Sequence, residues 1–161
     1  MIRKIIQKGS PILTAKCKKV TNFKEAQQTI QDLNDTMDYL KTTYAFARGI
    51  GLAAPQIGIN LQIAVIEFAD KKRYVLINPK IIETSKKKNP IREGCISFFE
   101  YRAMTPRYTY VKVKTYDEQG KKYFLEGEND AAMLLQHEID HLNGILYIQR
   151  LPKKEKELFL K

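Results

Sequence analysis

The chain has 161 residues, 43% of them apolar, which is enough for one domain with a hydrophobic core. Its 28 Lys and Arg residues outnumber 18 Asp and Glu residues, and the formal net charge of +10 favours attraction to polyanions such as RNA-rich surfaces. The sequence has no apolar run of about 18 residues and no secretory signal at its start, which argues against a membrane protein. We expect one domain over residues 1–161, cytoplasmic and monomeric, with no membrane partner.

The first predicted element is an amphipathic helix from about residue 23 to about residue 43. Asn22 followed by Glu25 has the spacing of a helix N-terminal cap. Apolar residues then recur at steps of three and four, which is the helical period: Ala26, Ile30, Leu33, Met37, Leu40 and Tyr44. We expect this helix to pack against a sheet.

A segment rich in glycine and alanine, residues 49–58, follows the helix. Its small residues leave room for another backbone to lie alongside. Gln56 carries an amide N–H₂ that can donate a hydrogen bond to a developing oxyanion. Alone, such a segment most often forms only a turn.

The middle of the chain predicts antiparallel strands. The strand-like runs 61–68 and 73–78 flank a short polar turn, as in a hairpin, and a second pair covers 108–116 and 121–126. One face of the third run is expected to be buried, and it carries Val111, Val113 and Thr115. Strands between two helices favour an α+β fold, with antiparallel β-sheets packed around a C-terminal helix, over alternating βαβ units.

The second predicted helix follows Asn129, which is expected to cap it, and ends just before Gly144. Its predicted apolar side consists of Ala132, Leu135, Ile139 and Leu142. The same helix carries His137 and His141, the only histidines of the chain. Helical positions i and i+4 are offset by about 40° and about 6 Å, so both rings can reach one metal ion.

The two histidines leave a catalytic metal site one protein ligand short, because an open site usually takes three. Cys95, beside Gly94, is the predicted third ligand, since a metal would hold its sulfur as thiolate. Otherwise a lone cysteine is a small buried hydrophobe. Glu138 follows the first histidine and can reach a metal-bound water without being a ligand. Both Cys95 and Cys17 are expected to be reduced.

Three segments together resemble the motifs of the peptide deformylase family. Residues 49–56, 93–97 and 136–142 are similar to its GxGLAAPQ, EGCLS and QHExDHL motifs, in the same order, and the resemblance covers nearly the whole chain. It implies that Cys95, His137 and His141 bind one divalent ion, expected to be Fe²⁺, with Zn²⁺, Ni²⁺ or Co²⁺ as alternatives. A set of one cysteine and two histidines suits iron and zinc equally.

The resemblance also implies a reaction, the removal of the formyl group from formyl-methionyl nascent peptides with release of formate. Metal-bound hydroxide would attack the formyl carbon, with Glu138 as general acid and base. Gln56 and the backbone N–H of Ile96 would face the oxyanion. The motif has Ile96 where the family usually has leucine, and it lacks the family's proline two residues after Ser97.

The peptide itself is expected, by the same resemblance, to lie extended beside the backbone of Ile50 and Gly51 in the manner of an added strand. Its first side chain would enter an apolar pocket to which Ile50 and Leu134 contribute. The basic charge suggests contact with the ribosome surface, but the sequence carries no signature of specific nucleic-acid recognition.

Two other functions remain open at this point. A zinc peptidase would need a third ligand downstream of the helix, where Glu155 and Glu157 lie in a lysine-rich tail. A non-catalytic, basic, ribosome-associated module would hold a structural metal with four protein ligands, and Cys17 lies in a separate N-terminal segment.

Overall fold

The computed structural model describes residues 1–159, so the last two residues of the predicted domain lie outside the described part. The helices are α1 (Phe23–Thr43), α2 (Asp130–Leu142) and α3 (Lys153–Phe159). The strands are β1 (Ile50–Ala53), β2 (Ile63–Glu67), β3 (Arg73–Thr84), β4 (Lys88–Cys95), β5 (Phe98–Tyr108), β6 (Tyr110–Tyr116) and β7 (Lys122–Glu128). Antiparallel sheets with these helices confirm the predicted α+β fold.

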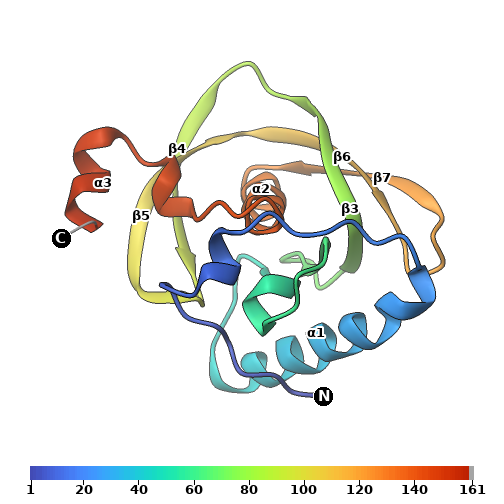
Figure 1. The fold of residues 1–161 in the computed structure, drawn as a ribbon. Coiled ribbons are helices and arrows are strands. Elements are labelled where there is room, and N and C mark those ends of the chain that lie inside the picture. The colour runs from blue at the N-terminus through green and yellow to red at the C-terminus, as the bar shows by residue number, and fades with distance from the viewer. Residues whose placement is uncertain (160–161) are drawn as a thin grey trace.

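Five strands form one antiparallel sheet in the order β1-β2-β3-β6-β7, and β4 and β5 form a separate hairpin. The two long helices cover opposite faces of the larger sheet. Alternate residues of β2 demonstrate this, because Val65 packs in the α1 cluster and Ile66 packs in the α2 cluster. Figure 1 shows α2 near the centre of the molecule, with α1 below it and the β4–β5 hairpin and α3 to one side.

The helix α1 has the predicted bounds, but Tyr44, predicted on its apolar side, is the residue after the helix and is exposed. The side chain of Asn22 accepts a hydrogen bond from the backbone N–H of Lys24 at 3.1 Å, which caps the helix. Its buried apolar residues are Ala26, Ile30, Leu33, Met37 and Leu40. These side chains pack on the sheet, as expected of an amphipathic helix whose stability comes from its apolar face.

The strands differ from their predicted bounds. β3 continues to Thr84, well beyond residue 78, and Tyr108 ends β5 instead of opening β6. The alternation within β6 is confirmed, since Val111, Val113 and Thr115 are all fully buried. β1 was not predicted to be a strand, and neither was β4 or β5. Residues 88–90 of β4 and 99–102 of β5 are exposed, so these strands lack the alternation of buried apolar and exposed polar residues that marks a strand in sequence.

The helix α2 begins where it was predicted, but the capping role of Asn129 is wrong. Asn129 adopts a φ of 51° and its side chain makes no capping hydrogen bond. The other end is as predicted, because Gly144 follows the helix with a φ of 73°, a left-handed conformation that favours glycine. The residues from Leu134 to Leu142 are all buried, so the helix is enclosed on every side and not only on its apolar face.

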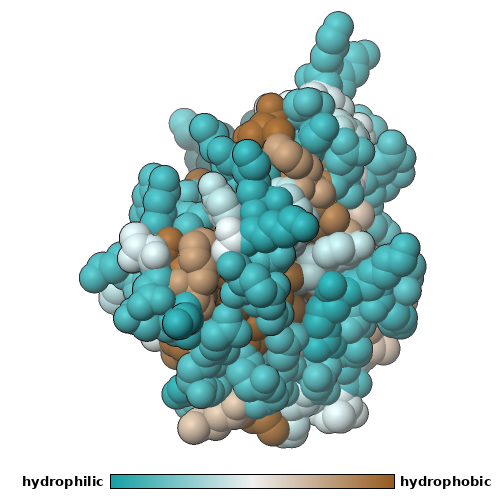
Figure 2. Space-filling view, turned by 90° about the vertical axis from the view of Figure 1, so that its right-hand side faces the viewer, coloured by the Kyte–Doolittle hydropathy of each residue, from teal (hydrophilic) through white to brown (hydrophobic). Residues whose placement is uncertain are grey.

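Residues 1–159 contain no helix long and apolar enough to cross a bilayer. Figure 2 shows the face toward the right-hand side of Figure 1, where hydrophilic side chains cover most of the surface and hydrophobic ones form only small separate patches. The two cysteines are both free and buried, as predicted.

Candidate metal centre and active site

Three side chains from two elements converge in the interior. Cys95 ends β4, and His137 and His141 lie on successive turns of α2. The Cys95 sulfur lies 3.3 Å from His141 Nε2, which lies 3.1 Å from His137 Nε2, and all three donor atoms are within 4.8 Å of one another. Donors on a tetrahedral zinc ion are separated by roughly 3.4 to 3.6 Å, given metal–ligand bonds of about 2.0 to 2.3 Å. The three donors therefore fit one divalent ion.

The chemistry of the donors fits as well. Burial acts to raise the pKa of the Cys95 thiol, but the facing rings of His141 and His137 outweigh it and hold that pKa well below its ordinary value. A thiolate is the form of cysteine that binds metals. Within residues 1–159 no fourth ligand joins this cluster, and such an open arrangement is typical of a catalytic site.

Glu93 holds the first histidine in place, a role that the sequence analysis missed. Its carboxylate accepts a hydrogen bond from His137 Nδ1 at 2.5 Å, which turns Nε2 toward the metal position. Burial acts to raise the pKa of Glu93, but hydrogen bonds from Arg107 and His137 lower it to about 2. Side chains two residues apart on a strand share a face, so the position of Glu93 two residues before Cys95 was the available signal.

The Glu93 carboxylate is itself held by a buried network. Arg107 donates two hydrogen bonds to it, at 2.9 and 2.6 Å, and a third to Asp140 at 2.6 Å. Asp140 then accepts two hydrogen bonds from Arg150. Arg107 pairs with both Glu93 and Asp140, and Arg150 pairs with Asp140 as well. The two positive and two negative charges therefore offset one another, whereas a single buried charge without a partner would be costly.

Glu138 lies in the same pocket with one oxygen unused. Its side chain is 2% exposed, and Oε2 has no hydrogen-bond partner within the described residues. Burial raises the pKa of this carboxyl to about 7, close to the value that suits a proton carrier at neutral pH. Gly51 makes room for it, because a Cβ at that position would lie 2.5 Å from the Glu138 carboxyl carbon. This glycine therefore accommodates a side chain, whereas the sequence analysis expected a neighbouring backbone.

Gln56 and Ile96 line the same pocket as Glu138. The Gln56 oxygen accepts a hydrogen bond from the N–H of Ala53, and its N–H₂ group donates to Ser97 Oγ at 3.2 Å and to the Cys95 sulfur at 3.5 Å. Its amide hydrogens therefore point toward the cluster. Ile96 lies in the turn that joins β4 to β5, directly after Cys95.

The pocket that unites these groups has a volume of about 110 Å³. Eight of the nine predicted site residues line it: Ile50, Gly51, Gln56, Cys95, Ile96, Leu134, His137 and Glu138. The ninth, His141, is 1% exposed and does not line the pocket. The alternative ligands Glu155 and Glu157 are exposed on α3 and do not join the cluster, which removes the main support for a zinc peptidase.

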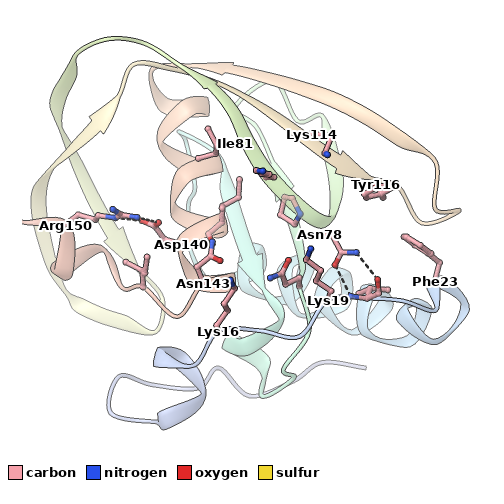
Figure 3. A pocket seen from close by; sticks show the side chains of 16 residues that line it. Lys16, Lys19, Phe23, Asn78, Ile81, Lys114, Tyr116, Asp140, Asn143 and Arg150 are labelled. Atoms are coloured by element: carbon pink, nitrogen blue, oxygen red, sulfur yellow. Dashed lines mark hydrogen bonds and ion pairs between the residues drawn. The ribbon is translucent and has the colours of Figure 1, made fainter.

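A larger groove, of about 750 Å³, lies elsewhere (Figure 3). Ile139, an α2 residue that lines this groove, is two positions from both His137 and His141, which on a helix is about 200° away. The groove is therefore on the opposite face of α2 from His137 and His141. Its basic side chains are Lys16, Lys19, Lys80, Lys114 and Arg150. We call this surface the basic groove.

The comparisons with known proteins agree with this geometry. A family model described as polypeptide deformylase matches residues 2–157. The peptide deformylase of Heliobacterium modesticaldum is 40% identical over 157 residues, which cover 97% of this chain and 98% of that protein. The crystal structure of peptide deformylase from Thermus thermophilus superposes with a TM-score of 0.88 at 36% identity, over 99% of this chain and 91% of that one. A deformylase from Synechococcus elongatus, solved in complex with actinonin, gives a TM-score of 0.84 at 36% identity, over 98% and 84% of the two chains.

Proposed function

The chain belongs to the peptide deformylase family, and from that premise we propose how its own residues carry out the reaction. The protein is a metal-dependent hydrolase that removes the N-terminal formyl group from nascent peptides. We assign Cys95, His137 and His141 as the metal ligands and Glu138 as the general acid and base. The observation that carries this assignment is the buried Glu138 carboxylate, which has an unpartnered oxygen in the same pocket as Cys95 and His137.

The bound metal would act as a Lewis acid that makes water nucleophilic near neutral pH. Glu138 accepts the proton of the attacking water and passes it to the departing nitrogen, so formate and a free amine are released together. Its pKa of about 7 lets it perform both transfers at neutral pH. Glu93 keeps the His137 ring oriented during turnover, because it holds the ring nitrogen that faces away from the metal position.

Two donors are assigned to the oxyanion that forms on the formyl oxygen. The Gln56 N–H₂ group would exchange one of its present partners, Ser97 or Cys95, for that oxygen. The second donor is the backbone N–H of Ile96, which survives the exchange of the family's usual leucine because it belongs to the main chain.

The peptide is assigned to the free edge of the larger sheet. β1 is the edge strand, and within the described residues it pairs only with β2, so its outer backbone groups at Ile50 and Gly51 can bind an extended peptide. The methionine side chain would enter the pocket between Ile50 and Leu134.

The metal in the cell is proposed to be Fe²⁺, with Zn²⁺, Ni²⁺ or Co²⁺ as replacements. Thiolate and imidazole donors bind all four of these ions, so the ligand set supports a divalent ion but does not distinguish among the four elements. Metal analysis of protein purified without oxygen would identify the ion, and a preparation that contains only zinc yet is fully active would overturn the choice of iron.

The ribosome surface is a proposed partner through the basic groove. Lys80 and Lys114 lie directly opposite each other in the β3–β6 register, an arrangement of like charges that is destabilising unless an anion lies between them. The phosphate backbone of RNA supplies such anions without base-specific recognition. Binding to ribosomes should weaken steeply with salt and weaken further in Lys80→Glu/Lys114→Glu, whereas Lys121→Glu/Lys122→Glu should bind as the wild type does.

We also infer that residues 1–161 form one catalytic domain that acts as a cytoplasmic monomer, because its substrates emerge from cytoplasmic ribosomes. Light scattering coupled to size exclusion would test the monomer. A mass of twice 18.7 kDa would contradict it.

The reaction is tested by incubating the iron-loaded protein with formyl-Met-Ala-Ser under anaerobic conditions. We expect formate and free amine in equal amounts, and no reaction with acetyl-Met-Ala-Ser, because a confined pocket admits hydrogen on the acyl carbon more easily than methyl. If the formyl peptide stayed intact while another deformylase cleaved it, the assignment would fail.

A further inference from the structure

A second groove opens directly from the metal pocket. It has a volume of about 360 Å³ and shares part of its wall with the pocket, including Gly49, Cys95, Ile96 and Met133. A peptide whose first side chain occupies the metal pocket can therefore place its next residues along this groove. Since an extended chain advances about 3.3 Å per residue, the second and third residues of the substrate lie within its reach.

Three arginines line this groove, and we call it the arginine groove. Arg48 precedes β1, Arg92 lies on β4 and Arg102 lies on β5. All three are exposed. The groove thus collects guanidinium groups from both of its walls, beside the residues that hold the metal.

The carboxylates near the groove do not neutralise all three arginines. Among residues 1–159, Glu93 is the one carboxylate in the groove wall, and it is 2% exposed and already bonded to Arg107 and His137. Asp130 forms an ion pair with Arg48 at 2.5 Å. In the described part of the chain Arg92 and Arg102 have no carboxylate partner, which leaves two positive charges facing the groove.

The guanidinium groups of Arg48 and Arg102 are held in position. Arg102 Nη1 donates to the backbone carbonyls of Phe99 and Tyr101 at 2.8 and 2.9 Å, and its guanidinium carbon lies 5.4 Å from the centre of the Phe99 ring. The Arg102 side chain also crosses Gly94, where a Cβ would lie 2.5 Å from its Cδ. Arg48 Nη1 donates to the backbone carbonyl of Arg92 at 2.8 Å, which joins the two walls.

From these contacts we propose that the arginine groove selects formyl peptides with an acidic side chain at the second or third residue. This inference rests on the proposed function and adds its substrate preference. Two unpaired guanidinium groups attract a carboxylate and repel an ammonium group, and each exposed pair contributes modestly. We expect kcat/KM for glutamate to exceed that for lysine by about tenfold. The difference should appear in KM, since these charges bind substrate and transition state alike.

The test compares formyl-Met-Ala-Xaa and formyl-Met-Xaa-Ala amides, where Xaa is Glu, Gln or Lys, by their rates of formate release. In at least one series the order should be Glu, then Gln, then Lys, and the spread should shrink in about 0.5 M salt, where the Debye length is only a few ångströms. Equal kcat/KM values in both series, or a preference for lysine, would overturn the inference while leaving the proposed function intact. Failure to cleave any of these peptides would overturn both.

Variants test whether the arginine groove is the source of the preference for glutamate over lysine. Arg92→Gln should reduce the Glu-to-Lys ratio, and Arg92→Glu should reduce it further, to about one, because the new carboxylate offsets the charge of Arg102. Arg102→Gln is less clean because that side chain also supports the Phe99 turn. Lys121→Gln, at an exposed turn before β7, removes the same charge away from the groove and should keep the wild-type ratio. If Arg92→Glu and Lys121→Gln both left the ratio unchanged, the groove would not be the source of selectivity.

Discussion

The helices α1 and α2 cover opposite faces of one sheet, yet they place their polar residues in opposite ways. α1 directs most of them to solvent and buries an apolar stripe, so its sequence explains its position. α2 buries Gln136, His137, Glu138, Asp140 and His141. Burying polar groups is costly without partners. Gln136, His137 and Asp140 have partners on β4, on β5 and at Arg150, whereas Oε2 of Glu138 has none within the described residues. A helix that breaks the amphipathic pattern in this way indicates a site rather than a support.

The sharpest test of this contrast exchanges one carboxylate on each helix. Glu138→Gln should lower formate release by about 10² to 10⁴-fold, because the variant cannot carry the proton. Its metal content should stay at the wild-type level, since Glu138 is not a ligand. Glu25→Gln, at the exposed start of α1, should change neither quantity. Wild-type activity in Glu138→Gln would rule out the assigned role.

The contact between β1 and α2 can be broken from the other side. In Gly51→Ala the new methyl group would overlap the Glu138 carboxyl group and displace it. A displacement of about 1 Å can cost about 10²-fold, so we expect a loss of that order in kcat with the metal retained. A variant that kept full activity would mean that Glu138 need not occupy its present position.

A third comparison uses two buried acids, Glu93, which contacts α2, and Asp32, which lies on α1. Glu93→Gln should lower metal affinity by about 10 to 100-fold, because Glu93 orients His137. Asp32→Asn, on α1, removes an equally buried acid that accepts a hydrogen bond from Arg3. It should reduce thermal stability without changing metal affinity. Equal metal affinities in the two variants, measured by competition with a chelating dye, would contradict the role of Glu93.

The effect of acid on α1 follows from Asp32. Burial acts to raise its pKa, but hydrogen bonds from the Met1 amino group and Arg3 lower it from 3.8 to about 2. The lowered pKa stabilises the folded state fully above about pH 4, and this contribution disappears as pH falls toward about 2. The difference in unfolding free energy between wild type and Asp32→Asn, measured by urea titration, should therefore shrink over that interval. A difference independent of pH would contradict this account.

The smallest expected effect is that of the α1 cap. Asn22→Ala removes the hydrogen bond to Lys24 and should lower the free energy of unfolding by about 1 kcal/mol. Formate release by the folded variant should equal that of the wild type. A large loss of activity would show that α1 is coupled to the site more closely than its contacts indicate.

The same contrast explains what could be predicted from sequence. The bounds of α1 followed from its cap and its helical period. The grouping of Cys95 with His137 and His141 was predicted from the spacing of the histidines and the shortage of one ligand, and the structure brings the three donors together. These signals are local or chemically rare. Asn129 shows the limit, because a residue suited to capping adopts a positive φ and leaves its side chain out of the cap.

The supporting network could not be predicted in the same way. The contacts of Glu93 with Arg107 and His137 join residues 14 and 44 positions apart. They form only when the β4–β5 hairpin folds against α2. Phe99, Tyr101 and Met104 of that hairpin are exposed, so its apolar residues do not alternate with polar ones. Its strands were therefore missed, and the contacts between them were missed as well. The sequence predicted that a small residue is needed at Gly51. The neighbour that requires it is the side chain of Glu138, which lies 87 positions further along the chain.

We propose that one sulfur and two ring nitrogens from β4 and α2 hold a single ion. X-ray absorption at the metal edge of the zinc-loaded protein tests it directly. We predict one sulfur at about 2.3 Å and two nitrogens at about 2.0 to 2.1 Å, with the sulfur absent in Cys95→Ala. A wild-type spectrum without sulfur, or one unchanged by Cys95→Ala, would contradict the claim.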